Sequence, residues 1–228
     1  MVRAEGDPPA GNRTEHEIYT RRFLAIYDPL ILGVYLRWVW RCPRAVLTEC
    51  YRVHAGARHL DVGPGTGYFL DVAELPEGTA ITLLDPNPAV LTQAARRLAR
   101  YGPATVPADA CEPLPLTGRF ESAALNLVLH CIAGEERKAA AIRHVAACLD
   151  EGGVLFGSSV LGTPQVHGWL GRTALHALNR RGIFSNRADA EEGLRDQLQE
   201  AFVEVTVERV GAVAVFVASR PQVHTTGS

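Results

Sequence analysis

Between residues 57 and 160 the sequence alternates short apolar runs with longer helix-like segments, and this alternation limits the possible folds more than any other feature. The apolar runs, which predict strands, cover 57–62, 79–85, 104–109, 120–130 and 152–160. The segments with helical spacing cover 66–75, 88–101 and 135–149. Strands and helices in this order form a parallel sheet with helices on both faces, because right-handed crossovers leave few other topologies.

The two ends of this pattern add further elements. Helices are expected over 168–184 and 188–201, and two β runs then fill 202–220 around Gly211. Because the loop between these two runs is short, they can form only a hairpin. The last strand should therefore be antiparallel to its neighbour. We therefore predict an α/β fold with a doubly wound, mostly parallel seven-stranded sheet and an antiparallel last strand.

The N-terminal region carries the longest apolar stretch of the chain, "FLAIYDPLILGVYLRWVW" over 23–40. Asp28, Pro29 and Arg37 interrupt it, which makes it a poor membrane span and favours two helices broken at Asp28 and Pro29. A third helix is expected from Pro43. Because the stretch is interrupted, we predict no stable membrane insertion. The start of the chain lacks the apolar core of a signal peptide and is expected to be disordered.

Composition narrows the classes of partner and compartment. The chain has 228 residues, 47% of them apolar, and a net charge of −2, so no broad basic field would attract nucleic acid. Its five cysteines never form a CxxC pair and lie mostly among apolar neighbours. This usage is typical of reduced thiols in the cytoplasm and indicates neither a disulfide framework nor a metal site.

The stretch "HLDVGPGTGYFLD" joins the first predicted strand to the first helix. Three glycines at alternate positions would let the backbone approach a ligand there, at the carboxyl edge where open α/β sheets bind their ligands. A dinucleotide fits poorly, because the third glycine of its fingerprint falls on Tyr68 and Asp61 would repel a pyrophosphate. A cationic ligand without phosphate fits better.

The motif "LDVGPGTG" resembles the first motif of class I S-adenosylmethionine-dependent methyltransferases of the small-molecule type. The resemblance implies S-adenosyl-L-methionine as cofactor, with Asp85 at the end of the second strand on the ribose hydroxyls. It also implies Asp109, after the third strand, near the adenine amine. A carboxylate is a suitable acceptor for both kinds of donor.

The stretch "YTRRFLAIYD" is similar to N-terminal lid helices of such enzymes, in which a tyrosine touches the methionine moiety; Tyr19 and Tyr27 are the candidates. The cofactor-binding residues expected from the resemblance comprise the glycine loop with its acid, the ends of the second to fourth strands, and one lid tyrosine. They are Asp61, Gly63, Gly65, Gly67, Asp85, Pro86, Asp109, Ala110, Asn126 and Tyr27.

The fourth motif of the family corresponds to "SAALNLVLHCI" here. Asn126 is not followed by two prolines and an aromatic residue, which argues against methylation of a nucleobase nitrogen. No acids cluster around it, so we expect no metal. His130, just past the fourth strand, is the first candidate for a general base, and a structural role is the alternative. His167, after the fifth strand, is the second candidate, followed by His176.

We therefore expect a cytoplasmic enzyme that methylates a small-molecule acceptor in a biosynthetic pathway. Two alternatives stay open: an S-adenosylmethionine-binding enzyme that performs a cyclisation or decarboxylation, and a non-catalytic subunit of a methyltransferase complex. A homodimer would cover the apolar N-terminal helices. The expected organisation has four parts: a disordered lead (1–14), a helical lid (15–54), and a Rossmann-like methyltransferase domain (55–220) that contains an acceptor-site insertion (161–200).

Overall fold

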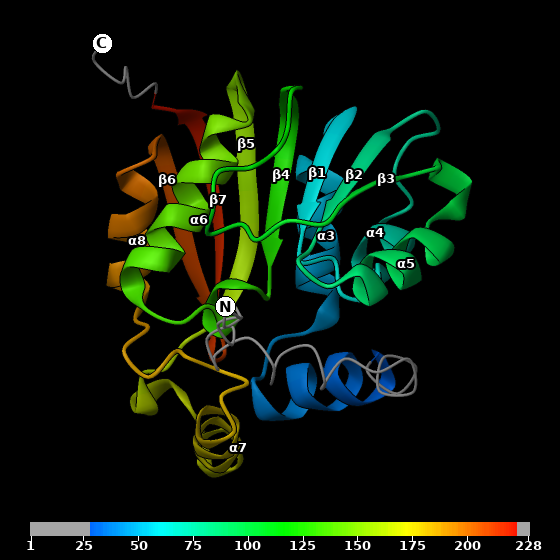
Figure 1. The fold of residues 1–228 in the computed structure, drawn as a ribbon. Helices are drawn as coiled ribbons and strands as arrows, with labels where there is room; N and C mark the ends of the chain where they lie inside the picture. Colours follow the sequence, from blue (N-terminus) through cyan, green and yellow to red (C-terminus); the bar gives the residue numbers. More distant parts are fainter. Residues whose placement is uncertain (1–27, 223–228) are drawn as a thin grey trace, which may run out of the picture.

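The computed structural model describes residues 28–222, in which seven strands form one sheet (Figure 1). The strand order is β3-β2-β1-β4-β5-β7-β6, and β7 is antiparallel to both of its neighbours. The other pairings, from β3 to β5, are parallel. The strands are β1 (Arg58–Val62), β2 (Ala80–Leu84), β3 (Ala104–Val106), β4 (Phe120–Asn126), β5 (Leu149–Val160), β6 (Phe202–Val210) and β7 (Val213–Pro221). The predicted doubly wound fold is confirmed.

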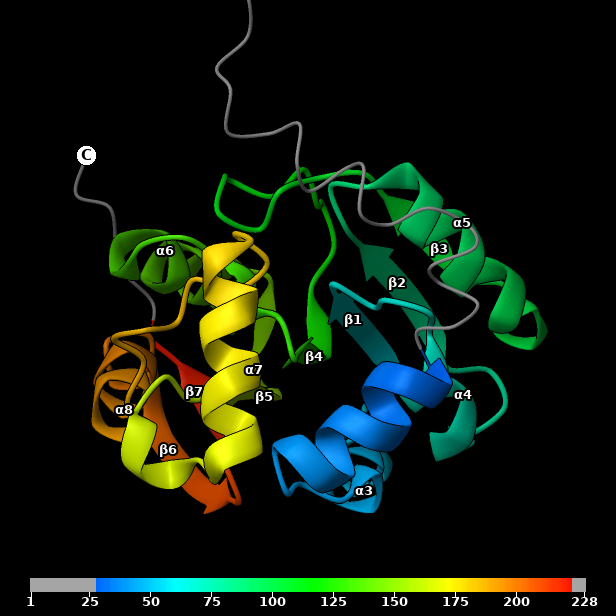
Figure 2. The same ribbon diagram turned by 90° about the horizontal axis from the view of Figure 1, so that it is seen from below.

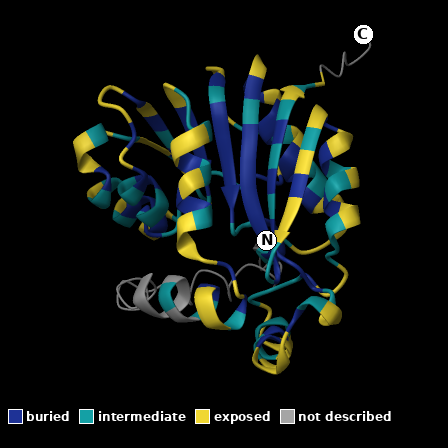
Figure 3. Cartoon of the chain, turned by 180° about the vertical axis from the view of Figure 1, so that it is seen from behind, coloured by how far each residue is buried: buried dark blue, intermediate teal, exposed yellow. Residues whose placement is uncertain are grey.

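Helices cover both faces of the sheet, and their inner faces form two separate apolar clusters. The outer sides of these helices are exposed, whereas the central strands are buried (Figure 3). One face is covered by α3 (Arg44–His54), α4 (Tyr68–Ala73) and α5 (Pro88–Arg97). The other is covered by α6 (Glu135–Ala147) and α8 (Glu191–Gln199). Short helical turns follow α5 at η2 (Ala99–Tyr101), β4 at η3 (Leu129–Cys131) and β5 at η4 (Pro164–Val166).

Two further helices, η1 (Asp28–Val39) and α7 (Trp169–Arg180), lie beyond the carboxyl ends of the parallel strands (Figures 1 and 2). A third apolar cluster holds them against the start of β7 and the end of β5. Trp40 is central to it, because its ring contacts both His167 and Phe184. These helices therefore form a layer over the edge of the sheet where α/β proteins bind ligands.

The strand ends at this edge are aligned by backbone hydrogen bonds. The Gly63 N–H donates to the Leu84 carbonyl at 2.8 Å, and the Asp85 N–H donates to the Val106 carbonyl at 3.3 Å. Val62 also pairs with Leu125 on β4. The segments that follow β1, β2, β3 and β4 consequently begin side by side.

The sequence predicted most of these elements, with differences at the ends. β4 stops at Asn126 rather than reaching residue 130, because Leu127 adopts a left-handed conformation with φ of 60°. β3 ends before Pro107, as the missing N–H of proline requires. η1 begins at Asp28, and the helix expected before it lies outside the described residues, so the break between the two helices stays a prediction. Within residues 28–222, no helix combines the length and apolar character needed to cross a bilayer.

Candidate active site

The loop between β1 and α4 turns through three glycines in the left-handed region, with φ of 64° at Gly63, 55° at Gly65 and 74° at Gly67. A Cβ on Gly63 would lie 2.6 Å from the Val128 side chain, so only glycine fits there. A Cβ on Gly65 would meet nothing within 4 Å. The tip of the loop therefore presents bare backbone to open space, as close approach of a ligand requires.

The segment after β4 packs against this loop. Leu127 changes the direction of the chain, and its N–H donates to the Ser158 carbonyl at 2.8 Å. The turn brings Val128 onto Gly63. A leucine at positive φ costs about 1–2 kcal/mol, and conformations of this kind are found at sites where geometry matters more than stability.

Asp61 lies at the end of β1 with 2% of its surface exposed, beneath α3. The Tyr51 hydroxyl on α3 lies 3.2 Å from one carboxylate oxygen of Asp61 and 3.4 Å from the other. Burial raises the pKa of Asp61 to about 7, and the hydrogen bond from Tyr51 opposes that rise. A buried carboxylate with one hydroxyl partner among the described residues is suited to receive a cation.

Asn126 ends β4 on the same face of the sheet. Its side-chain oxygen accepts a hydrogen bond from the Ser158 hydroxyl on β5, and the two residues are paired in register. The Asn126 side-chain nitrogen is buried beside the Tyr51 hydroxyl, where it lowers the pKa of Tyr51, but it makes no well-aligned hydrogen bond with a described residue. A buried donor without a well-aligned acceptor is suited to bind a ligand oxygen or nitrogen.

Asp85 follows β2 and shapes the next segment. One of its carboxylate oxygens accepts from the Asn87 N–H at 2.7 Å, and the Asn87 side chain in turn caps α5 by accepting from the Ala89 N–H. Asp85 is half-buried and Pro86 is exposed. The carboxylate is thus held at the strand end, next to the glycine loop that begins beside Leu84.

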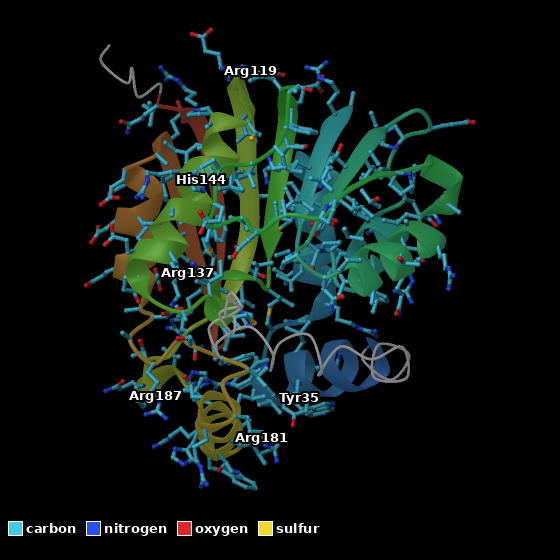
Figure 4. The ribbon with its side chains drawn as sticks, in the orientation of Figure 1. Tyr35, Arg119, Arg137, His144, Arg181 and Arg187 are labelled. Carbon is cyan, nitrogen blue, oxygen red and sulfur yellow. The ribbon has the colours of Figure 1, made fainter. Side chains whose placement is uncertain are left out.

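Both carboxylate oxygens of Asp109 have partners within the protein, which the sequence did not indicate. One carboxylate oxygen accepts from the Cys111 N–H at 2.9 Å, and the other forms an ion pair with Arg137 on α6 at 2.9 Å. Ala110 is buried, and its carbonyl lies 3.1 Å from Nδ1 of His144. Figure 4 shows Arg137 and His144 together on α6, so this helix fixes the loop after β3.

His130, on η3, is buried against the ring of Phe184 at a centroid distance of 4.3 Å. Its Nδ1 accepts from the Val160 N–H at 3.3 Å, which assigns the ring proton of the neutral form to Nε2. Burial, with a further contribution from Lys138, lowers the pKa of His130 to about 3. The side chain is therefore neutral at pH 7 and offers a donor at Nε2.

Lys138 lies beside this region on α6, with 3% of its side chain exposed. It donates to the Asp189 carboxylate and, at 3.0 Å, to the Ser185 carbonyl. Burial raises the pKa of Asp189 to about 6, and Lys138 opposes that rise. The pair ties α6 to the segment between α7 and α8, whose Ser185 N–H also donates to the His130 carbonyl at 2.8 Å.

His167 lies in the third apolar cluster rather than on an open surface. Its Nε2 is 2.7 Å from the Leu161 carbonyl and so carries the proton, which leaves the lone pair on Nδ1. Nδ1 is buried without a partner among the described residues, and a Cβ on Gly171 would lie 3.1 Å from it. The lone pair thus faces the backbone of α7.

The structure brings the glycine loop, Asp61, Asp85 and Asn126 together at one edge and places Asp109 after the neighbouring strand. Tyr19 and Tyr27 lie outside the described residues. Sequence reasoning missed Tyr51 and Ser158, which hold two of the predicted site residues. Tyr51 precedes Asp61 by ten residues on the helix before β1, and only the packing of α3 on the sheet pairs them. In the described ranges no three His, Cys, Asp or Glu side chains gather as metal ligands do.

Comparisons with known proteins agree with this geometry. Residues 60–155 match a family described as "Methyltransferase domain". The chain is 39% identical over 201 residues to demethylluteothin O-methyltransferase of Streptomyces thioluteus, covering 87% of both chains. It is 34% identical over 215 residues to the physcion biosynthesis cluster O-methyltransferase of Aspergillus chevalieri, covering 89% of this chain and 97% of that one.

The fold also resembles the N-methyltransferase NodS of Bradyrhizobium japonicum WM9, solved with S-adenosyl-L-homocysteine. The TM-score is 0.63, with 18% identity over 92% of this chain and 97% of NodS. The fold and its carboxyl edge therefore define a class I methyltransferase. The chain belongs to the methyltransferase family, and it is an S-adenosylmethionine-dependent enzyme that acts on a small molecule in biosynthesis.

The residues present fit this cofactor. The buried carboxylate of Asp61 suits the cationic ligand, the Gly65 backbone is open, and the Asn126 nitrogen has no well-aligned acceptor among the described residues. When bound, S-adenosyl-L-methionine supplies an electrophilic methyl group on a positively charged sulfur.

Proposed function

We propose that the enzyme transfers this methyl group to a hydroxyl oxygen of an apolar small-molecule acceptor. Oxygen is proposed as the acceptor atom because the chain is 39% identical, over 87% of both chains, to a relative named as an O-methyltransferase. A second relative that matches along nearly its whole length carries the same description.

In this proposal, the predicted cofactor residues bind S-adenosyl-L-methionine. Asp61 would pair with the methionine ammonium group, and Asp85 would accept from the ribose hydroxyls. The loop at Gly63, Gly65 and Gly67 would lie against the methionine and ribose. The remaining members of the set are Pro86, Asp109, Ala110, Asn126 and Tyr27.

Tyr51 joins this set as a residue that acts through Asp61. Its hydroxyl donates to the carboxylate and so favours the ionised form that a cation requires. It also restricts the carboxylate to one orientation under α3. Both effects would strengthen cofactor binding without direct contact between Tyr51 and the cofactor.

The acceptor would lie between the carboxyl edge and the layer formed by η1 and α7. The aromatic side chains of Tyr35, Trp40 and Phe184 in the third cluster give this layer an apolar character. Catalysis would depend mainly on holding the acceptor oxygen in line with the methyl group. We also propose the division of the chain into a lid over 15–54 and a methyltransferase domain over 55–220. The insertion over 161–200 would form part of the acceptor site.

His130 remains the first candidate for proton transfer from the acceptor hydroxyl. In the arrangement seen here its Nε2–H would hold the acceptor oxygen as a donor, and action as a base would require the other tautomer. His167 is the second candidate, and its Nδ1 would need α7 to move before it met an acceptor.

A binding and turnover comparison tests the proposal. Isothermal titration with S-adenosyl-L-homocysteine should show binding, and a panel of phenolic acceptors should give S-adenosylhomocysteine and an O-methyl product in equal amounts. Acceptor product without S-adenosylhomocysteine would favour cyclisation or decarboxylation. Cofactor binding without any product would favour a non-catalytic subunit.

Two variants test the histidine. If His130 carries the proton transfer, His130→Ala should abolish turnover and leave the cofactor dissociation constant unchanged. His130→Gln keeps a side-chain donor, so partial activity in that variant would indicate a role in holding the acceptor. Near-normal turnover of His130→Ala would reject both roles.

We also propose that the enzyme is a homodimer and that it is located in the cytoplasm.

A further inference from the structure

The layer beyond the carboxyl edge has an unusual distribution of charge. Residues 29–48 and 161–188 contain seven arginines and no aspartate or glutamate. The rest of the chain holds the other 16 of its 23 basic residues and all 25 acidic ones. A protein of net charge −2 therefore has two segments rich in arginine, one that covers η1 after its first residue, Asp28, and one that contains α7.

Four exposed arginines of the layer that η1 and α7 form make no ion pair with a described residue. Arg37, Arg172, Arg180 and Arg181 are exposed, and none of them forms an ion pair with a residue that the structure describes. Figure 4 shows Arg181 at the end of the molecule beyond the sheet, close to α7. The Arg172 Nε–H donates to the His167 carbonyl at 3.2 Å, but no described carboxylate neutralises the charge of these four arginines.

α7 is an amphipathic helix whose outer side has a definite chemistry. Gly171 and Leu175 are buried, whereas Trp169, Arg172 and His176, at helical spacing, are exposed. Trp169 has 75% of its surface exposed, although a tryptophan that served only the fold would be largely buried.

η1 continues this surface at its C-terminal end. A Cβ on Gly171 would lie 3.2 Å from the Val39 carbonyl, so the end of η1 abuts the start of α7. The neighbouring Trp38 is 67% exposed, and the Arg37 guanidinium lies 5.6 Å from its ring centroid. Figures 1 and 2 show both helices at this end of the molecule. We define the outer face as Arg37, Trp38, Trp169, Arg172, His176 and Arg180.

We propose that this outer face binds the surface of anionic phospholipid membranes. Tryptophan rings favour the boundary between headgroups and acyl chains, and arginines pair with lipid phosphates, so both residue types of the face find partners at an anionic bilayer surface. The apolar side of α7 packs inside the protein, so the exposed tryptophan rings and arginines of the outer face alone would contact the bilayer.

This placement would orient the carboxyl edge towards the membrane. An apolar acceptor dissolved in the bilayer would then reach the site through the η1 and α7 layer without crossing water. The inference is independent of the acceptor atom, because lipid binding is measured without turnover.

Vesicle flotation of the full chain tests the proposal. Vesicles of phosphatidylcholine alone and of an equal mixture with phosphatidylglycerol are compared at about 0.1 M and about 1 M salt. We expect binding to the anionic vesicles at low salt, weak binding to the neutral ones, and loss at high salt. No binding to anionic vesicles at low salt, or equal binding to both kinds, would overturn the proposal.

Matched variants locate the binding surface. Two double variants should each weaken vesicle binding by at least about tenfold. One is Trp38→Ala with Trp169→Ala, and the other is Arg172→Glu with Arg180→Glu. Val203→Ala and Arg143→Glu are controls, since both residues are exposed but lie on β6 and α6. Thermal unfolding and binding of S-adenosyl-L-homocysteine verify that each variant is folded. Face variants that bind like the controls would contradict the assignment.

Other occupants of the face would give different results. The full chain could form a dimer and bind no vesicles. If the tryptophan double variant then dissociated that dimer, the face would be assigned to a second copy of the chain. The full chain could instead bind immobilised polyglutamate and no vesicles. If the arginine double variant abolished that retention, the face would be assigned to an acidic protein. Either result would overturn the membrane proposal.

Discussion

The Tyr51 hydroxyl on α3 lies 3.2 Å from the carboxylate of Asp61 at the end of β1, where both side chains are almost fully buried. This contact links the helix before the sheet to the strand that begins the glycine loop. It also supplies the hydrogen bond that keeps the pKa of Asp61 from rising further in its buried position. Cofactor affinity should therefore depend on a residue outside the glycine motif.

Tyr51→Phe should weaken binding of S-adenosyl-L-methionine at pH 7 by about five- to tenfold, as expected for the loss of a hydrogen bond worth about 1 kcal/mol. Isothermal titration across pH provides a sharper readout. With the hydrogen bond removed, the pKa of Asp61 rises, so the gain in affinity with increasing pH should occur at higher pH than in the parent enzyme. Tyr101→Phe, whose hydroxyl donates to the Leu75 carbonyl, is the control and should bind normally.

Asp61→Asn should stabilise the fold while it weakens cofactor binding. The pKa of Asp61 in the folded protein, about 7, exceeds its ordinary value of 3.8, so the unfolded chain releases the proton first as pH rises. Stability is therefore lost between these two values, and the variant should gain about 2–4 kcal/mol at pH 8. Denaturant titrations at several pH values measure the gain, which should shrink as pH falls towards 4. A variant less stable than the parent at pH 8 would contradict this.

Asp71→Asn is the control for that experiment. Asp71 forms an ion pair with Arg100 on the surface, and both side chains are partly exposed. Removal of such a pair changes stability by at most about 1 kcal/mol and should not reproduce the dependence on pH near 7.

Gly63→Ala and Gly65→Ala should differ although both glycines have positive φ. Each substitution places a side chain in the left-handed region at a cost of about 1–2 kcal/mol. Gly63→Ala adds a collision with Val128, so it should lower the free energy of unfolding further. Gly65→Ala should chiefly reduce cofactor affinity, because its Cβ enters open space. Adding Val128→Ala to Gly63→Ala should recover part of the loss, and strictly additive effects would refute the contact.

Lys138→Met should destabilise the protein by about 3–5 kcal/mol, because it leaves the Asp189 carboxylate buried without its cationic partner. Lys138→Met/Asp189→Leu removes both charges and should recover much of that loss. Chemical denaturation of the two variants gives the comparison. Equal stability of the single and double variants would show that the ion pair does not couple α6 to the segment before α8.

The sequence predicted the alternation of strands and helices and the glycine loop because these depend on local periodicity and on residues close together in the chain. The end of β4 was misplaced because residues 127–130 are apolar and read as a continued strand, whereas packing of Val128 on Gly63 requires Leu127 to turn. A contact between segments 65 residues apart leaves no trace in a local pattern.

The partners of the site residues were less predictable for the same reason. Asp109 was expected to be available to the adenine, but Arg137 reaches it from α6. Tyr51 meets Asp61 only after α3 packs on the sheet. The tautomers of His130 and His167 are set by backbone groups of β5 and the residue that follows it, which no spacing in the sequence reveals.

The buried pairing of Lys138 has a chemical consequence. Lys138 is the single lysine among 228 residues, and the other basic side chains that carry permanent charge are all arginine. The folded chain thus offers no accessible side-chain amine in its described part, and acylating reagents would reach Lys138 only when α6 separates from Asp189. Its rate of acylation would report how often that opening occurs, from a position next to His130.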